Sequence, residues 1–456
     1  MAGFSARGSY RIDMLNGPLL GKMVLFALPL AISTVLQQLF NAADIAVVGR
    51  FASKQALAAV GSNGATINLL IGLFVGLSVG TNVLIAKFIG QGSTERVQRA
   101  VHTSIVVALA SGVFLLFLGQ AASRPMLEFM EAPHDVIDLA TLYLRIYFLG
   151  VPFIMLFNFG AAILRSKGDS RRPLYCLFLA GVCNVILNLI LVIVFHLGVA
   201  GVAIATVVSN VISSSLVMWF LFHEEPLIRL SLSRLRLHAA ELREIFSIGA
   251  PAGLQGMMFS LSNVAIQTAI NSFGSAAVAG SAAALNFEFV TFLLVDAFCQ
   301  AVTTFTSQNY GAGCEERCKR VFWLGMGSAL LLKSSAITLS WMLREPLVAL
   351  FTVDAAVLPY AMARLRYVLL WAMVSVPFGV AGAALRGLGH SMVPAVLTVV
   401  GTCLFRFVWL WTFFRHWHTF EALMFVYPVS WILTSVMMMA AYFAVRKKAF
   451  APFHQQ

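Results

Sequence analysis

Three of the 19 acidic residues lie well inside long apolar stretches of the sequence: Asp44, Glu288 and Asp296. If such a stretch crosses a bilayer, a charge at its centre costs about 2.5–3.5 kcal/mol on insertion scales, so each acid needs a partner or a function. Removal from water favours the uncharged form of a carboxylate, and a group poised in this way takes up and releases protons. Reversible binding of H+ or of a cation is therefore the chemistry that these residues offer.

Polar amides and a set of prolines accompany these acids. Asn184 and Asn188 are four residues apart and share one face of a helix, as do Asn41 and Asp44, three residues apart. Hydrogen bonds between helices explain amides in apolar segments more often than contact with a ligand does, and both interpretations stay open. The remaining intramembrane amides are Gln37, Asn158, Asn263 and Gln267, and the predicted hinges are Pro29, Pro152, Pro251 and Pro377.

The composition indicates which elements position these groups. The chain has 456 residues, of which 60% are hydrophobic and only 11% are charged. Soluble domains carry about a quarter charged residues, so a water-soluble enzyme, a nucleic-acid-binding module and a disordered chain are excluded. The apolar runs are long and continuous, which excludes transmembrane strands. The sequence predicts an all-α polytopic membrane protein.

Twelve segments are long enough to cross a bilayer. A membrane-spanning helix needs about 20 consecutive, mostly apolar residues. The predicted spans are 22–44, 60–86, 100–121, 138–163, 173–195, 199–222, 245–270, 278–306, 321–343, 359–384, 392–414 and 421–445.

The positive charges predict the orientation of these spans. Twelve spans place both ends of the chain on one side of the membrane. Lys and Arg gather on that side, from Arg7, Arg11 and Lys22 before the first span to Arg446 after the last. Cytoplasmic loops are enriched in Lys and Arg, so both termini are expected in the cytoplasm. The formal charge of +12 then reflects topology, and no nucleic-acid partner is expected. The other side holds Arg50, Lys54, Arg124, Arg344 and Arg415.

The chain contains one pattern twice. Residues 90–99 recur as 311–320, and residues 164–173 recur as 385–394, both at an offset of 221. An even number of spans separates the copies, so they share one membrane orientation and form a parallel repeat, as in several transporters. We expect an N-lobe at 1–222, a cytoplasmic linker at 223–244, a C-lobe at 245–445 and a cytoplasmic tail at 446–456, with substrate bound between the lobes.

These motifs resemble those of the multidrug and toxic compound extrusion (MATE) transporters. Leu39-Phe-Asn-Ala-Ala-Asp44-Ile-Ala-Val-Val-Gly49 is similar to the signature of their first helix. Further matches are the loops at 164–170, 311–317 and 385–391 and the segment 201–206, so the resemblance covers nearly the whole chain. The major facilitator family, a twelve-span rival, has an Asp-Arg-rich loop between spans 2 and 3 that is absent here.

The resemblance implies two six-helix bundles arranged as a V in the inner membrane of a bacterium. It implies alternating access and export of organic cations, drugs or toxic metabolites in exchange for H+ or Na+. We expect a monomer that handles a cationic amphipathic small molecule in contact with the lipid bilayer, and no cofactor, metal or enzymatic activity. A lipid-linked oligosaccharide flippase of the same superfamily is the alternative, although it would be expected to have a more cationic cleft. A membrane-embedded enzyme would need clustered catalytic residues.

The resemblance also assigns residues to the ion. Asp44 matches the coupling carboxylate of the N-lobe, and Asn184, Asn188 and Thr206 match the positions that join it. Many relatives have a second Asp where Asn188 stands. Oxygen atoms of the four residues could hold Na+, and protonation of Asp44 could serve H+ coupling. Both ions stay open.

The C-lobe departs from the family pattern. The acidic positions that some relatives have in spans 7 and 10 fall at Phe259 and Ser375. Glu288 and Asp296 are about two helical turns apart and could face the cleft together. We expect Lys333 and Arg406 to neutralise them in buried ion pairs, or else one of the two acids to bind a cationic substrate.

Overall fold

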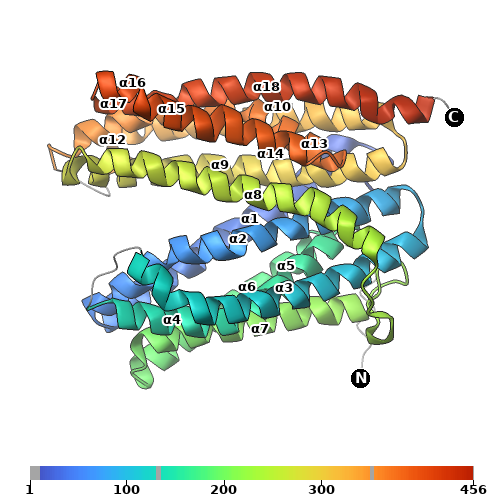
Figure 1. The fold of residues 1–456 in the computed structure, drawn as a ribbon, viewed down its shortest axis with the longest axis horizontal. Helices are drawn as coiled ribbons and strands as arrows, with labels where there is room; N and C mark the ends of the chain where they lie inside the picture. The colour runs from blue at the N-terminus through green and yellow to red at the C-terminus, as the bar shows by residue number, and fades with distance from the viewer. Residues whose placement is uncertain (1–10, 130–134, 350–353, 455–456) are drawn as a thin grey trace. The chain divides into compact units, whose positions relative to one another are not determined.

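The computed structural model describes residues 11–129, 135–349 and 354–454, and all regular elements in these ranges are helices. Arg7, one of the positive charges counted above, lies outside the described residues. The chain divides into two compact units, Met1–Ala250 and Pro251–Gln456, which are described separately. Figure 1 shows the helices of each unit running side by side.

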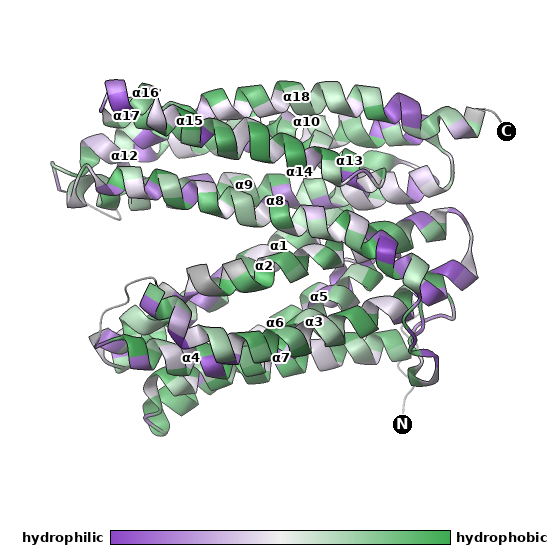
Figure 2. Cartoon of the chain, in the orientation of Figure 1, coloured by the Kyte–Doolittle hydropathy of each residue, from purple (hydrophilic) through white to green (hydrophobic). Residues whose placement is uncertain are grey.

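The membrane-spanning helices match the expected segments. In the described ranges, nine helices are long and apolar enough to cross a membrane, or up to eleven if each of two bent helix pairs counts as one span. The one expected span that these helices do not include is 245–270. It lies in α8 (Ala239–Asn271), whose middle is rich in Gly, Ser and amide residues. Figure 2 shows hydrophobic residues along most of the helix lengths, with hydrophilic residues concentrated near the helix ends. The expectation of an all-α polytopic fold is confirmed.

The first unit is built from the helices before α8 and the start of α8. Helix α6 packs against α1 and α7, and α5 packs against α2, α3 and α7. Buried apolar side chains such as Leu115, Phe148 and Phe159 form its core. The bounds of these helices are α1 Leu19–Phe51, α2 Lys54–Gly90, α3 Thr94–Phe129, α4 Ile137–Leu149, α5 Val151–Ser166, α6 Arg171–Leu189 with a π-helical continuation Ile190–Val194, and α7 Gly198–Phe222.

The second unit is more interrupted, because three of its spans are assembled from several short helices. Helix α9 packs against α10, α12 and α13, and α18 packs against α13. The bounds of its helices are α9 Ser275–Gly311, α10 Glu315–Met342, α11 Arg344–Ala349, α12 Leu358–Arg364, α13 Val376–Gly387, α14 Met392–Thr398, α15 Phe405–Trp411, α16 Phe413–His416, α17 Phe420–Met424 and α18 Val426–Phe450. In this unit, π-helical turns occupy Leu365–Leu369 and Val399–Leu404, and 3-10 turns occupy Ala372–Ser375 and Ala451–His454; a further 3-10 turn, Leu232–Arg234, lies in the first unit.

The four predicted hinge prolines fall into two structural groups. Pro152 is the second residue of α5, where the α4–α5 pair bends by 46°. Pro377 is the second residue of α13, in the second segment of a pair, Leu358–Leu369 and Ala372–Gly387, that bends by 42°. Pro29 and Pro251 lie inside the uninterrupted helices α1 and α8. The first bend therefore lies at Pro152, because a proline lacks the amide donor that would continue the preceding helix. The second bend lies between Leu369 and Ala372, before Pro377.

The stretch 223–244 packs within the first unit. The His238 backbone N–H donates to Thr103 Oγ1 at 3.2 Å, which ties the start of α8 to α3. Helices α2 and α8 approach closely where each has a glycine: a Cβ on Gly80 would lie 2.3 Å from the carbonyl oxygen of Ile245, and a Cβ on Gly249 would lie 2.5 Å from the Cα of Leu77. This part of α8 therefore packs directly against the backbone of α2.

The sequence repeat is also visible in the backbone. Gly92 follows α2 and Gly313 follows α9, and the two have the same left-handed conformation, with φ of +70°. Each ends its helix at the loop that carries the repeated motif. Side chains rarely adopt this conformation, which accounts for a glycine at both positions.

Candidate functional site

The first polar site lies inside the first unit, where three helices meet. Asp44 of α1 has an exposed fraction of only 7%, and α1 packs here against α6 and α7. Apolar residues dominate all three helices, so their burial brings the few polar side chains together. Asn184 and Asn188 reach the site from α6 and Thr206 reaches it from α7.

Hydrogen bonds connect these four side chains into one cluster. The amide nitrogen of Asn188 donates to Oδ1 of Asp44 and, at 3.2 Å, to Oδ1 of Asn184. The hydroxyl of Thr206 lies 3.4 Å from Oδ2 of Asp44 and donates at 3.0 Å to the carbonyl oxygen of Val202. The structure thus brings together the four residues to which the resemblance assigns the ion.

The charge of this cluster is not compensated by the protein. Among the residues that the structure describes, no Lys, Arg or His forms an ion pair with Asp44, whose side-chain partners are the neutral Asn188 and Thr206. The oxygen Oδ1 of Asn188 is also buried and has no hydrogen-bond partner. A buried carboxylate without a counter-charge is stable only when a proton or a cation neutralises it. The cluster therefore has the chemistry of a reversible H+ or cation site.

Other polar residues of the first unit lie outside the cluster. Gln37 and Asn41 are exposed, so Asn41 does not join Asp44 although both are on α1. The amide of Asn158 donates at 2.9 Å to the carbonyl oxygen of Ile154 in its own helix.

The second unit contains a buried ion pair that the sequence did not predict. Arg364, the last residue of α12, donates from Nε and Nη2 to the two carboxylate oxygens of Glu288 in α9, at 2.7 and 3.0 Å. The exposed fractions of the two residues are 2% and 4%. The expected buried ion pair at Glu288 is present, but its basic residue is Arg364, and the expectation that Lys333 or Arg406 fills this role is wrong. Arg364 falls within the predicted span 359–384. A basic residue inside an apolar span needs an acidic partner, and this was the signal in the sequence that could have identified Arg364.

Lys333 and Arg406 have neutral partners instead. Nζ of Lys333 donates to Ser375 Oγ at 2.9 Å, and Nη1 of Arg406 donates to Oδ1 of Asn263 at 2.8 Å. Arg406 also lies over the ring of Phe259, 5.4 Å from its centroid. Phe259 and Ser375, the positions at which the resemblance implies acids, thus contact the two cations.

The remaining polar candidates of the second unit are near its surface. Asp296 is exposed and accepts a hydrogen bond from Gln300 at 2.8 Å, so it does not pair with Lys333 or Arg406 and does not share the environment of Glu288. Gln267 donates to Asn271 at 3.1 Å within α8.

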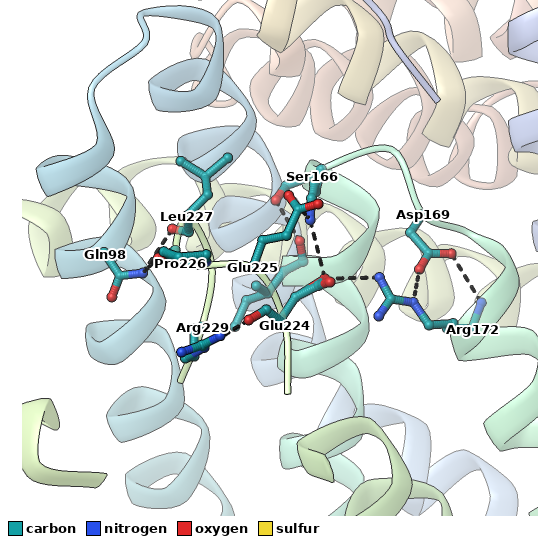
Figure 3. Close-up of polar contacts among 11 residues, drawn as sticks. Gln98, Ser166, Asp169, Arg172, Glu224, Glu225, Pro226, Leu227 and Arg229 are labelled. Atoms are coloured by element: carbon teal, nitrogen blue, oxygen red, sulfur yellow. Dashed lines mark hydrogen bonds and ion pairs between the residues drawn. The ribbon is translucent and has the colours of Figure 1, made fainter. Parts of the chain in front are cut away.

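A second ionic network lies at the loop after α5 (Figure 3). Arg172 donates to Asp169 and, at 2.9 Å, to Glu224, while Nζ of the buried Lys167 lies 3.4 Å from Glu224 and 2.9 Å from Glu225. The hydrogen bond and charge of Lys167 hold the pKa of Glu225 below its usual range. Asp169 also accepts from the first backbone N–H groups of α6, so the network fixes the start of that helix.

Membrane-spanning helices with a buried, unpaired carboxylate are typical of a polytopic membrane transporter, and comparison with known proteins gives the family. The family model MatE matches residues 29–190 and matches again over residues 251–412. The chain belongs to the MATE family of transporters. The double match coincides with the internal repeat.

Relatives and solved structures agree with this assignment. The probable multidrug resistance protein YoeA of Bacillus subtilis is 28% identical over 83% of both chains. The FAD transporter of Shewanella oneidensis is 25% identical over 77% of this chain and 78% of its own. A crystal structure of MATE in the bent conformation has a TM-score of 0.90 at 22% identity and covers 96% of this chain and 98% of that one. These relatives are transporters and not enzymes.

Proposed function

We propose that this protein is a secondary transporter that exports small amphipathic molecules from the cell in exchange for H+ or Na+. The observation that carries this proposal is the buried carboxylate of Asp44, which has only neutral partners, Asn188 and Thr206. An ion that neutralises Asp44 changes the charge inside the first unit, and such a change is what an ion gradient can drive.

The proposed cycle follows from linkage. In the outward-facing state, Asp44 takes up the ion, and substrate affinity falls. In the inward-facing state the ion leaves, Asp44 regains its charge and substrate binds. The coupling is reciprocal: if the bound ion lowers the affinity for the substrate, the bound substrate lowers the affinity for the ion by the same factor. Asn188 Oδ1, a buried acceptor without a partner, is a further oxygen ligand for Na+.

The substrate class is an inference from the family and from relatives. Organic cations are the class that the resemblance implies, and the printed names of relatives include multidrug resistance proteins and a FAD transporter. Of the acids considered for a cationic substrate, Glu288 is already neutralised by Arg364, so the exposed Asp296 is the better candidate. We propose that the protein lies in the inner membrane of a bacterium with both termini in the cytoplasm, as the distribution of Lys and Arg supports.

Transport in liposomes tests the proposal. The purified protein is reconstituted, and movement of ethidium, an organic cation, and of FAD is followed under an imposed pH gradient and then under an imposed Na+ gradient. We expect one gradient to drive at least one of the two compounds. Asp44→Asn is expected to abolish this gradient dependence, whereas Asp138→Asn, which changes a carboxylate whose side chain is 79% exposed, is expected to retain it. Movement of neither compound with folded protein, or wild-type coupling in Asp44→Asn, contradicts the proposal.

A further inference from the structure

The second unit has more buried positive than negative charge. Its buried charged residues, within the part of the chain that the structure describes, are Glu288, Lys333, Arg364 and Arg406. Glu288 is fully engaged by Arg364, which uses two donors on the two carboxylate oxygens. Lys333 and Arg406 form no ion pair within these residues, and the acid whose charge acts on both is the same Glu288 that Arg364 already pairs. A buried charge is expensive unless it is paired, so this arrangement calls for an anion.

Aromatic rings in contact with one another connect the surroundings of Lys333 with those of Arg406. Nζ of Lys333 lies 4.0 Å from the ring centroid of Phe292, and the Phe292 and Trp431 rings are 5.9 Å apart. The Trp431 and Tyr427 rings are 5.6 Å apart, and the guanidinium of Arg406 lies 4.6 Å from the centroid of Tyr427. Both cations thus border one aromatic surface formed by α9 and α18.

Two donors at this surface have no acceptor. Nη2 of Arg406 and Nε1 of Trp431 are buried and make no hydrogen bond within the described residues. The exposed fractions of Arg406 and Trp431 are only 1% and 2%, so solvent does not satisfy these donors. An unsatisfied buried donor costs about 1–3 kcal/mol, and more when the group is charged. An acceptor that carries negative charge would satisfy both donors and neutralise the cations.

The side chains around this cluster also indicate how a ligand reaches it. Asn263, which accepts the hydrogen bond from Arg406, is an exposed residue, and Phe259 and Phe292 are half-buried. Arg406 is therefore one side chain away from the surface of its unit. A planar apolar body can lie against the rings while its acidic group reaches the donors.

We propose that the second unit contains a binding site for the acidic group, a carboxylate or a phosphate, of an aromatic small molecule. Arg406 and Lys333 bind the acidic group, Trp431 donates a hydrogen bond to it, and Phe292 and Tyr427 contact the apolar body. This inference adds a substrate class to the proposed function, but it concerns binding alone and does not depend on ion coupling.

A pair of dyes with opposite charges tests the site. Pyrenebutyrate and pyrenebutyl-trimethylammonium share a ring system and an alkyl chain and differ in the charged group. Their binding to the detergent-solubilised full chain is measured by quenching of tryptophan fluorescence in a gluconate buffer. We expect pyrenebutyrate to bind at least tenfold more tightly than its cationic counterpart. Equal binding, or preference for the cation, overturns the proposal.

Matched variants locate the site. Arg406→Gln and Lys333→Gln are each expected to weaken pyrenebutyrate binding at least tenfold, and Arg406→Lys is expected to recover much of the loss. Arg415→Gln, which removes an exposed arginine of the same unit, is expected to bind as the wild type does. Size-exclusion elution and circular dichroism show whether each variant is folded. Unchanged affinity in folded Arg406→Gln overturns the proposal, and so does loss that Arg406→Lys fails to restore.

Competition distinguishes the sources of the acidic group. Free FMN or FAD at micromolar concentration is expected to displace pyrenebutyrate. Displacement only by chloride or inorganic phosphate would identify a site for a simple ion, and displacement only by phosphatidylglycerol would identify a lipid site; either result overturns the small-molecule proposal. Asp138→Asn, which changes an exposed carboxylate outside both polar sites, is expected to bind pyrenebutyrate as the wild type does. Binding is measured without an ion gradient and transport with one, so failure of ion coupling and failure of this site are separate results.

Discussion

The carboxylate of Glu288 and the guanidinium of Arg364 form a bidentate ion pair in which both partners are almost fully buried. Breaking such a pair leaves a lone charge in an apolar interior, whereas replacing both partners removes that penalty. Glu288→Gln is therefore expected to destabilise the protein by about 3–5 kcal/mol. The double variant Glu288→Gln with Arg364→Met is expected to recover most of that loss. Unfolding in mixed micelles of increasing SDS content measures both changes.

The control for this prediction is Glu345→Gln, because Glu345 pairs with Arg344 at the surface. An exposed pair contributes less than about 1 kcal/mol. A single Glu288→Gln variant that is as stable as the control would show that Arg364 is neutralised in another way.

The close approach of α2 and α8 predicts a second stability effect. A methyl group on Gly80 would meet the backbone of Ile245, which cannot rotate away, so Gly80→Ala is expected to destabilise the first unit by about 1–3 kcal/mol. Gly72 lies in the same helix and faces open space. Gly72→Ala is expected to be neutral or to stabilise by up to about 1 kcal/mol, since alanine is the better helix former. Equal melting temperatures of the two variants would contradict the prediction.

Two asparagines of the first unit, Asn188 and Asn158, are expected to differ in their importance for transport. Asn188 donates to Asp44, so Asn188→Ala removes a partner of the charged carboxylate and is expected to lower ion-driven transport at least tenfold. Asn158 bonds only a carbonyl of its own helix, and Asn158→Ala is expected to keep more than half of the activity. Initial rates in liposomes at several ion concentrations measure the effect. A similar loss in both variants would indicate general damage to helix packing.

Acid is expected to weaken the network around Lys167. The pKa of Glu225 is lowered from 4.5, first by the hydrogen bond from Lys167 and then by its charge, so the folded protein binds this proton less readily than the unfolded chain. The resulting stabilisation is present above the ordinary pKa and is lost as the pH falls through the lowered value. Glu225 is mostly exposed, which keeps the contribution below about 1 kcal/mol. The melting temperature of Glu225→Gln should lie below that of the wild type at pH 6 and converge with it near pH 3; a constant difference would refute this explanation.

Much of the fold could be predicted from the sequence, because apolar length determines which segments cross a membrane. The break between α4 and α5 lies within one predicted span, and only the placement of Pro152 hinted at it. The boundary between the units could not be predicted from composition. The polar stretch before α8 resembles a linker, but contacts such as that between Thr103 and His238 attach it to the first unit.

The two polar sites differ in how far the sequence specified them. Asp44 and Thr206 belong to motifs, Asn188 matches a position that the resemblance assigns, and the structure brings the three together. The partner of Glu288 depends on which helix faces meet, and Arg364 is 76 residues away, at the end of a short helix that continues into a π-helical turn. Spacing along the chain gives no information about such a contact, so Lys333 and Arg406 were equally reasonable choices.

The double match to the family model implies that the two halves descend from one ancestral half-length chain. They differ in electrical sign: the first has a buried acid, Asp44, that pairs with no base, and the second has more buried basic than buried acidic residues among those described. The halves are consequently no longer interchangeable. A chain assembled from two first halves would have two buried acids without a base and would lack the buried Lys333, Arg364 and Arg406.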